Sequence, residues 1–297
     1  MSRKQLAFIT PSYAGDHQRC LLLCESLDRM AQDDFCHYVL VADHDFALFK
    51  PLQGPRRQVI PDSALLPSWL KPFRRPFDSK QRWMWGSLTH PVWPMSGWHV
   101  QQLRKMLIAR HIDQDILVMC DSDSVFVRPF GIDRFCHDKL VRLYTLENAI
   151  TPAPHLRHHI TWCRQAASIL GLPAPWFPAT DYINNMVSWS RHHALLMLDH
   201  IESLSGRDLV STMGRWRTFS EYQIYGAFVD GVLKHEGHFA DPNPLALSYW
   251  GGEALDSQSL QSFTATLQPH HCAIGIQSFT GTTTEVLRRY LEEASAR

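Results

Sequence analysis

The sequence has no excess of charge of either sign and no long apolar run. Lysine and arginine together number 29, as do aspartate and glutamate, so no net charge favours nucleic acid as a partner. No stretch approaches the roughly 20 apolar residues of a membrane-spanning helix. The early apolar run, residues 6–9, is too short for a signal-peptide core. We therefore expect a cytoplasmic protein that binds no nucleic acid.

Paired cysteines are also missing. The seven cysteines are an odd number, and none of them forms the Cys-x-x-Cys pair that is typical of zinc sites and redox motifs. Cys20 and Cys24 lie one helical turn apart within an apolar stretch. Reduced, buried cysteines in a cytoplasmic protein account for this pattern.

The first half of the chain alternates between strand and helix patterns. Strand patterns occur at residues 6–10, 38–42, 58–60 and 116–120, and helical patterns occur at residues 16–31 and 98–111. This order predicts an α/β fold with a Rossmann-like, mostly parallel central sheet flanked by helices. Asp16, directly after Gly15, is the expected N-cap of the first helix.

The second half is less regular. Its patterns predict strands at residues 140–146, 182–189 and 272–276, and helices at residues 156–170, 192–203, 221–233 and 284–294. The sequence contains no internal repeat, low-complexity tract or evident linker between domains. Because 297 residues suffice for one large core, we expect a single domain over residues 1–297 with an elaborated second half.

Two carboxylates follow the apolar run 116–120. Asp121 and Asp123 are one residue apart at the carboxyl end of an expected buried strand, where parallel sheets bind their ligands. Two hard oxygen ligands suit Mg²⁺ or Mn²⁺, which completes its shell with water and substrate phosphates. The motif alone favours a metal site and a plain strand-end turn equally.

The Asp-x-Asp pattern occurs twice more. Asp113 and Asp115 precede their strand, which favours a polar turn. Asp43 and Asp45 follow the strand 38–42 and so lie at a carboxyl end as well. Since an acidic group after the second strand of a Rossmann-like half often receives a ribose hydroxyl, we assign Asp43 to a nucleoside.

The segment 68–98 is rich in tryptophan and basic residues and has no clear period. Five of the ten tryptophans lie here, with five basic residues against one aspartate. Indole faces stack on sugar rings and basic side chains pair with phosphates, so one interpretation is a wall of a binding site. A peripheral contact with the inner membrane is the second interpretation. A surface loop held by buried tryptophans is the third.

Several segments together resemble a bacterial family of glycosyltransferase-like proteins that is described mainly as a domain of unknown function. The resemblance covers nearly the whole chain. The segments that carry it are Thr10-Pro11-Ser12-Tyr13, Gly97-Trp98 with Gln101-Gln102-Leu103 and Lys105, Asp121-Ser122-Asp123 with Phe126-Val127-Arg128-Pro129-Phe130, Ser220-Glu221-Tyr222 with Tyr225-Gly226, and Ile276-Gln277-Ser278.

This resemblance implies a GT-A fold, in which a Rossmann-like domain holds a nucleotide-diphosphate sugar through Mn²⁺ or Mg²⁺ on the Asp-x-Asp motif. Asp121 would approach the ribose and the metal, and Asp123 the metal. Residues 1–130 would form the half that binds the nucleotide sugar, and residues 131–297 the half that binds a glycan or lipid-linked acceptor. The donor-side residues that we expect, besides Asp43 and Asp121, are Thr10, Pro11, Ser12, Tyr13, Gln101 and Lys105.

Gln101 and Lys105 are four residues apart and so share one helix face, where the lysine could balance diphosphate charge. A solvated polar stripe explains the same spacing. In GT-A enzymes a histidine near the C-terminus often adds a metal ligand, and His270 and His271 are the candidates here.

The acceptor hydroxyl of an inverting enzyme needs a carboxylate base. Glu221, at the start of an expected helix, is our first candidate and Asp181 is the second. Ser220 and Glu221 are equally well explained as a helix cap. Retaining enzymes of similar layout instead place an Asn-rich strand near the sugar, which Asn184 and Asn185 fit, so the anomeric outcome stays open.

Two other functions explain the same motif. In haloacid-dehalogenase-type phosphatases, an Asp-x-Asp loop provides the nucleophile and the acid/base. That motif usually stands near the start of the chain and precedes Gly-Thr, whereas here about 120 residues precede it and Ser124-Val125 follow. The other alternative is a nucleotide-sugar-binding protein without turnover. Hydrolysis of simple aryl phosphates would favour the phosphatase.

Overall fold

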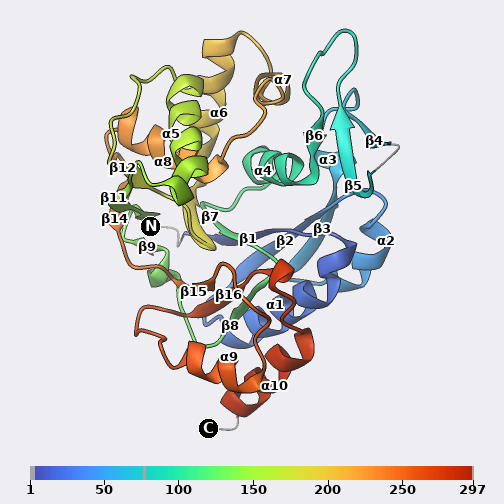
Figure 1. The fold of residues 1–297 in the computed structure, drawn as a ribbon, viewed down its shortest axis with the longest axis vertical. Coiled ribbons are helices and arrows are strands. Elements are labelled where there is room, and N and C mark those ends of the chain that lie inside the picture. The colour runs from blue at the N-terminus through green and yellow to red at the C-terminus, as the bar shows by residue number, and fades with distance from the viewer. Residues whose placement is uncertain (1–3, 76–77, 296–297) are drawn as a thin grey trace.

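The centre of the molecule is a sheet with the strand order β13-β7-β1-β2-β3 (Figure 1). The structure is a computed structural model that describes residues 4–75 and 78–295. Strands β1, β2, β3 and β7 are parallel, and β13 is antiparallel to β7. Their bounds are Leu6–Pro11 (β1), Phe35–Val41 (β2), Arg57–Pro61 (β3), Ile116–Cys120 (β7) and Met186–Ser190 (β13). The mixed α/β class and the mostly parallel sheet are confirmed.

Successive residues of the central strands face two different cores. Ile9 packs with helices α4 (Gly97–Leu107) and α8 (Glu221–Gly231) on one face. Phe8 packs with α1 (His17–Met30) on the other. Because side chains alternate along a strand, an apolar run such as that of β1 requires cover on both faces. The helices on both sides of the sheet provide it.

Smaller sheets surround the central one. Strand β8 follows β7 and pairs antiparallel with β16, which also pairs parallel with β15. The bounds of these and the remaining strands are Lys71–Arg75 (β4), Asp78–Trp85 (β5), Met95–Ser96 (β6), Ser124–Phe126 (β8), Cys136–His137 (β9), Leu140–Tyr144 (β10), Leu146–Ile150 (β11), Ala179–Asp181 (β12), His238–Asp241 (β14), Ala246–Tyr249 (β15) and Ala273–Ile276 (β16).

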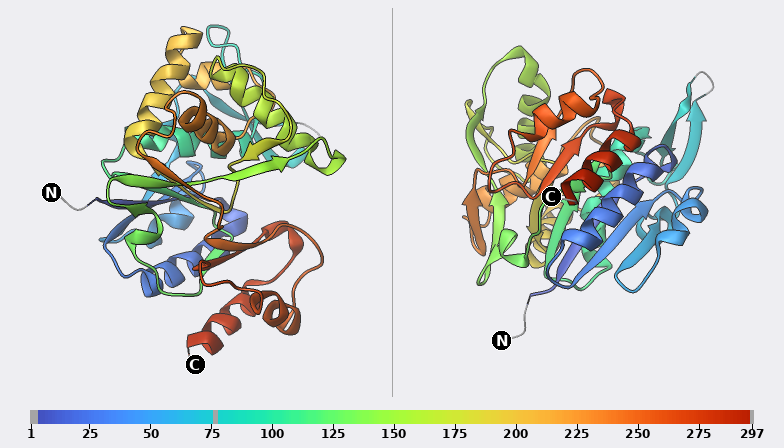
Figure 2. Two further views of the ribbon diagram at one scale, coloured as in Figure 1. Left: turned by 90° about the vertical axis from the view of Figure 1, so that its left-hand side faces the viewer. Right: turned by 90° about the horizontal axis from the view of Figure 1, so that it is seen from below.

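The remaining helices form two groups on opposite sides of the sheet. In the left view of Figure 2, α5, α6 and α8 lie above the sheet and α9 and α10 lie below it. Helix α10 runs beside α1 in the right view, and an Arg288–Glu25 ion pair of 2.8 Å joins them. The bounds are Phe46–Phe49 (α2), Asp62–Leu65 (α3), Arg157–Ile169 (α5), Arg191–Ser205 (α6), Leu209–Met213 (α7), Ser257–Thr264 (α9) and Thr284–Ser295 (α10). Among the described residues, no helix combines the length and apolarity needed to cross a bilayer.

The sequence did not predict β14, β15 or α9, and three segments that it did describe differ from the structure. The predicted strand 140–146 is divided between β10 and β11, and the strand expected from residue 182 begins only at Met186. Segment 68–98, expected to lack regular structure, contains β4, β5 and β6. These strands pair only with one another, so no central core imposes an alternating pattern on them. The side chain of Trp83 lies outside the described part of the structure.

A buried histidine network joins α8 to β13 and β14. His238 is 5% exposed, and its Nδ1 donates to the Glu236 carbonyl at 2.9 Å. Its Nε2 then accepts from the Tyr225 hydroxyl at 2.8 Å, while that hydroxyl accepts from the Ser190 amide. Burial, with a smaller contribution from the nearby His193, lowers the pKa of His238 to about 4. The folded protein therefore keeps this imidazole neutral.

We predict that part of the acid sensitivity of the fold comes from His238. The unfolded chain protonates this residue near pH 6.5 and the folded chain only near pH 4, so stability is full above pH 6.5 and falls as the pH drops toward 4. His238→Gln keeps an acceptor for Tyr225 and removes the titration. Urea denaturation from pH 7 to 4 should show a slope smaller by up to about 1.4 kcal/mol per pH unit.

The matched control for this measurement is His111→Gln, at an exposed position. This variant should keep the wild-type pH profile. An unchanged profile in His238→Gln would contradict the prediction.

Candidate active site at the carboxyl edge of the sheet

Polar side chains gather where the parallel strands end. Asp121 directly follows β7, and Tyr13 lies in the loop after β1. Strand β13 begins opposite the end of β7, with Met186 paired to Cys120, so Asn185 lies at the same edge. In parallel α/β sheets, ligands bind outside the carboxyl ends of the strands. The arrangement therefore forms a candidate ligand site.

Lys105 lies at the centre of this group. Its side chain is 3% exposed, and its Nζ lies 2.7 Å from Asp121 Oδ1 and 3.2 Å from Glu221 Oε1. The ammonium also donates to the Tyr222 hydroxyl at 2.6 Å. Gln101, one turn earlier on α4, donates to Asp121 Oδ1 at 3.3 Å. The shared helix face predicted for Gln101 and Lys105 is therefore directed at Asp121 and is not a solvated stripe.

The charges in this cluster depend on one another. Burial alone would lower the pKa of Lys105, but the adjacent Asp121, with Tyr222 and Glu221, raises it well above its ordinary value. Burial raises the pKa of the Glu221 carboxyl, and Lys105 counteracts part of that change. Lys105 is therefore a buried ammonium that holds Asp121 and Glu221 together.

The start of α8 fixes Glu221 in this cluster. Ser220 is the N-cap, since its Oγ accepts from the Gln223 amide at 3.3 Å. The backbone amide of Glu221 donates to the Gln102 side chain of α4 at 3.1 Å. The sequence left open whether Ser220 and Glu221 cap the helix or Glu221 acts as a base. In the structure the cap is provided by Ser220. The Glu221 side chain pairs with Lys105.

Asp123 carries a buried oxygen without a partner. The residue is 9% exposed, and within the described residues its Oδ1 accepts no hydrogen bond. Burial raises the pKa of Asp123 to about 7, with contributions from Asp121 and Asp16. The backbone carbonyl of Asp123 accepts from the Ile276 amide at 3.1 Å, which fixes the end of β16 beside it. Such an orphaned carboxylate oxygen is costly unless a ligand satisfies it.

Asp16 belongs to the same site, which the sequence did not reveal. We expected it to cap α1, but its side chain makes no capping bond. Asp16 has a φ of −103° and a ψ of 11°. An N-cap residue whose side chain bonds the helix amides usually has an extended backbone instead. Its Oδ2 instead accepts from Ser122 Oγ at 3.4 Å. Burial raises the pKa of Asp16, and the nearby Arg19 opposes that effect.

The residues around Asp121 fit a divalent cation. Four carboxylates, those of Asp16, Asp121, Asp123 and Glu221, face the cations of Lys105 and Arg19. Within residues 4–75 and 78–295, no group of three or more His, Cys, Asp or Glu side chains is arranged to hold a metal alone. The orphaned Asp123 oxygen and the acidic excess suit a cation that takes two carboxylates and completes its shell from water and substrate.

The loop after β1 contributes unequally to the site. Thr10 is fully buried and its Oγ1 lies 2.9 Å from His37 Nε2, so its hydroxyl is occupied in the core, contrary to our expectation of a donor contact. Pro11 ends β1, and Ser12 is buried with no partner for its hydroxyl among the described residues. Tyr13 is 55% exposed. A Cβ at Gly15 would meet the Tyr13 ring, so a larger residue here would require this exposed ring to move.

The other two Asp-x-Asp copies have structural partners. Asp43 Oδ1 accepts from the Ser63 amide at 3.1 Å and from its hydroxyl, so this carboxylate is engaged by α3. Asp45, which we had not singled out, is 7% exposed and accepts from the Ala14 amide at 3.1 Å. Asp115 accepts from the Gln5 amide before β7, in agreement with the expected polar turn.

Asparagines enter the site beside β16. Asn184 Oδ1 and Asn185 Nδ2 are buried without partners among the described residues. A Cβ at Gly275 would lie 1.9 Å from Asn185 Nδ2, so glycine is required where this side chain crosses β16. Asp181 lies three residues before Asn184, where its Oδ1 accepts from the Ile183 amide and its Oδ2 is 2.9 Å from His159 Nδ1.

The C-terminal histidines lie away from Asp123. The end of β16 at Ile276 is bonded to Asp123, and His271 lies five residues earlier, roughly 16 Å away along an extended chain. There Arg128 Nη1 donates to the His271 carbonyl at 3.4 Å. The structure therefore does not bring His270 or His271 to the aspartate pair, contrary to our expectation of a metal ligand.

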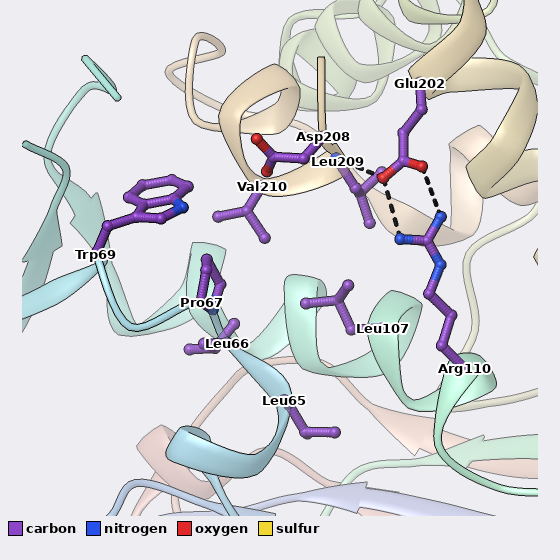
Figure 3. Close-up of a pocket in the computed structure, with 10 residues that line it drawn as sticks. All are labelled: Leu65, Leu66, Pro67, Trp69, Leu107, Arg110, Glu202, Asp208, Leu209 and Val210. Atoms are coloured by element: carbon purple, nitrogen blue, oxygen red, sulfur yellow. Dashed lines mark hydrogen bonds and ion pairs between the residues drawn. The ribbon is translucent and has the colours of Figure 1, made fainter. Parts of the chain in front are cut away.

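A pocket of about 400 Å³ lies elsewhere, between α3, α4 and α7 (Figure 3). Leu65, Leu107 and Val210 give it mostly apolar walls, and it contains the ion pair between Arg110 and Glu202 at 2.8 Å. Its lining does not include Asp121 or Lys105. This pocket is therefore separate from the acidic edge.

Fold and site together define an α/β protein with a cluster of acidic side chains at the carboxyl edge of a mostly parallel sheet. The chain belongs to a family of unknown function, DUF6492, which matches residues 6–293. A comparison with curated proteins gives no match. The function must therefore be inferred from the site itself.

We predict that Lys105→Met destabilises the fold by about 3–5 kcal/mol. The substitution removes the cation that pairs with the carboxylates of Asp121 and Glu221, which lie mostly buried. The double variant Lys105→Met/Glu221→Gln should recover part of this loss. Urea denaturation measures both. The control Lys50→Met, at an exposed position, should change stability by less than about 0.5 kcal/mol. Equal effects of the two lysine substitutions would show that the cluster does not stabilise the fold.

Proposed function

We propose that this protein is a metal-dependent glycosyltransferase of the GT-A type, which transfers a sugar from a nucleotide-diphosphate donor to a glycan or lipid-linked acceptor. One observation carries the proposal. Asp121 and Asp123 stand at the carboxyl edge of a parallel sheet in an acidic cluster, and a buried Asp123 oxygen has no partner there. A cation bridging these carboxylates to a diphosphate would satisfy both features.

Asp121 and Asp123 would hold Mn²⁺ or Mg²⁺. When bound, the cation neutralises the charge that develops on the departing diphosphate. Lys105 and Gln101 keep Asp121 in place, since both contact its Oδ1. Because Lys105 is buried with three protein partners, it is a positioning residue in this proposal and does not contact the diphosphate directly.

The nucleoside would lie over the loop that follows β1. Tyr13 offers an exposed ring for stacking against a base. Asp45 ties this loop to the end of β2 through the Ala14 amide. Asp43 would bind the ribose through Oδ2, because Ser63 already donates to Oδ1. Asn184 and Asn185 would face the donor sugar, since each has an unsatisfied buried polar atom.

Asp181 is better suited than Glu221 to act as the base for an acceptor hydroxyl. The Asp181 side chain is 15% exposed and is oriented by His159 and the Ile183 amide. Glu221 is 4% exposed and shares Lys105 with Asp121. A base must reach the proton that it removes. We therefore assign Asp181 to the acceptor and Glu221 to the positioning of Lys105.

For a lipid-linked acceptor, the segment around β4–β6 would contact the membrane in which the acceptor lies. Trp85 and Trp93 are 56% and 50% exposed, and Leu88 is fully exposed. Exposed indoles together with Lys71 suit the headgroup region of a membrane. This peripheral contact with the inner membrane belongs to the proposal.

We predict that Asp123→Asn removes Mn²⁺-dependent donor binding while leaving or raising the thermal stability of the protein alone, since it removes an uncompensated buried charge. A thermal-shift screen with UDP-, GDP-, CMP- and dTDP-sugars, with and without Mn²⁺, measures both effects. The wild type should show a metal-dependent shift with one nucleotide class.

Asp113→Asn, in the exposed Asp-x-Asp copy, is the control and should bind as the wild type does. An Mn²⁺-dependent shift that survives in Asp123→Asn would place the metal elsewhere. If the wild type shows no shift and hydrolyses p-nitrophenyl phosphate, the phosphatase alternative replaces the proposal.

We predict opposite kinetic signatures for the two carboxylate candidates. Asp181→Asn should lower kcat about 10²–10⁴-fold with little change in donor affinity, as expected for loss of a base. Glu221→Gln should instead weaken donor affinity and lower the melting temperature, because it acts through Lys105. Release of nucleoside diphosphate from the donor found by thermal shift gives kcat. The reverse pattern would make Glu221 the base.

A further inference from the structure

Two tryptophans from separate helices stack beside the site. The rings of Trp98, on α4, and Trp162, on α5, have centroids 5.7 Å apart and planes inclined by 29°. Trp162 Nε1 donates to Thr218 Oγ1 at 2.9 Å, which fixes its indole. Trp98 nevertheless remains 43% exposed. Trp98 is thus an exposed ring stacked on an indole that a hydrogen bond holds, which suits it to bind a ligand.

The position of Trp98 on α4 relates it to the donor residues. Trp98, Gln101 and Lys105 are spaced i, i+3 and i+7, which places them on one stripe of the helix. With a rise of about 1.5 Å per residue, Trp98 lies about 4.5 Å along the axis from Gln101 and about 10 Å from Lys105. Gln101 and Lys105 contact Asp121. Trp98 therefore stands one turn beyond the proposed donor site, about one sugar ring away.

A polar pair, His159 and Asp181, borders the aromatic platform formed by Trp98 and Trp162. The imidazole of His159 lies 5.1 Å from the Trp162 ring, and its Nδ1 is 2.9 Å from Asp181 Oδ2. The His159 side chain is 26% exposed and that of Asp181 is 15% exposed. The platform is therefore bordered by a carboxylate and an imidazole that exchange hydrogen bonds with hydroxyl groups readily.

We propose that Trp98 and Trp162, with His159 and Asp181, form the acceptor subsite and that its occupant is a sugar ring of a glycan. The C–H face of a pyranose would cover the exposed Trp98 indole, and its hydroxyls would meet His159 and Asp181. This inference rests on the proposed function, because it takes the Asp121 edge as the donor site.

The chemistry of the platform separates a sugar from other occupants. A lipid chain over Trp98 would remove water from the partly exposed Asp181 carboxylate, which is costly even though the Ile183 amide and His159 remain its partners. A phosphate group would be repelled by Asp181 and by the acidic cluster near Asp121. A sugar satisfies both the apolar face and the polar border, because one of its faces is C–H and its rim carries hydroxyls.

The test is saccharide binding in the absence of nucleotide and metal. Methyl glycosides of glucose, galactose, mannose and N-acetylglucosamine, and short oligosaccharides of the same sugars, are titrated at millimolar concentrations and followed by tryptophan fluorescence and ligand-observed NMR. We expect saturable binding of at least one saccharide. Trp98→Ala should weaken it roughly tenfold or more, and Trp98→Phe should restore much of it by keeping an aromatic face.

Trp85→Ala is the matched control, since Trp85 is also an exposed indole but lies on β5 and makes its ring contact with Phe73. It should bind saccharide as the wild type does. Equal binding by Trp98→Ala and wild type, a loss in Trp85→Ala as large as in Trp98→Ala, or no binding of any saccharide would overturn the subsite. Circular dichroism and melting temperature confirm that each variant is folded.

The thermal-shift screen distinguishes failure of this inference from failure of the proposed function. If saccharides bind through Trp98 but no nucleotide sugar shifts the melting temperature, the platform is a carbohydrate site and the transferase proposal fails. If a nucleotide sugar binds with Mn²⁺ but Trp98→Ala leaves saccharide affinity unchanged, the donor site is supported and the proposed acceptor subsite is wrong.

Discussion

The buried ammonium of Lys105 is the interaction on which the site depends. It contacts Asp121 from the end of β7 and Glu221 and Tyr222 from the start of α8, and it is itself carried by α4. These elements are far apart in the chain, and their polar groups could not share a dry interface without a cation between them. Lys105 therefore joins the central sheet to the helices above it and sets the direction of the Asp121 carboxylate.

The same cluster leaves one group unsatisfied. Asp123 keeps a buried oxygen without a partner among the described residues, although Ser122 and Asp16 lie close by. A protein selected only for stability would not retain such a charge, whereas a binding site retains it because the ligand completes it. In our proposal Lys105 positions Asp121, because it contacts Asp121 Oδ1 as Gln101 does. Asp123 binds the ligand, because its Oδ1 has no partner among the described residues.

Much of the fold could be predicted from the sequence because its central strands are buried on both faces and so form continuous apolar runs. The site was predictable only in part. Asp121 and Gln101 follow from strand ends and helix spacing, but the pairing of Lys105 with Glu221 joins residues that no local pattern relates. Asp16 was missed because its position before a helix suggested a cap. His271 was misplaced because sequence does not show which end of β16 meets Asp123.

We propose that Asp123 and Asp121 bind a divalent cation together with a nucleoside diphosphate. The most direct measurement is a crystal structure of the protein grown with Mn²⁺ and the nucleoside diphosphate that binds most tightly, with anomalous data collected at the manganese edge. We predict an anomalous peak within bonding distance of both the Asp123 carboxylate and the diphosphate. A diphosphate bound without a peak at Asp123, or a peak at another part of the protein, would contradict the account.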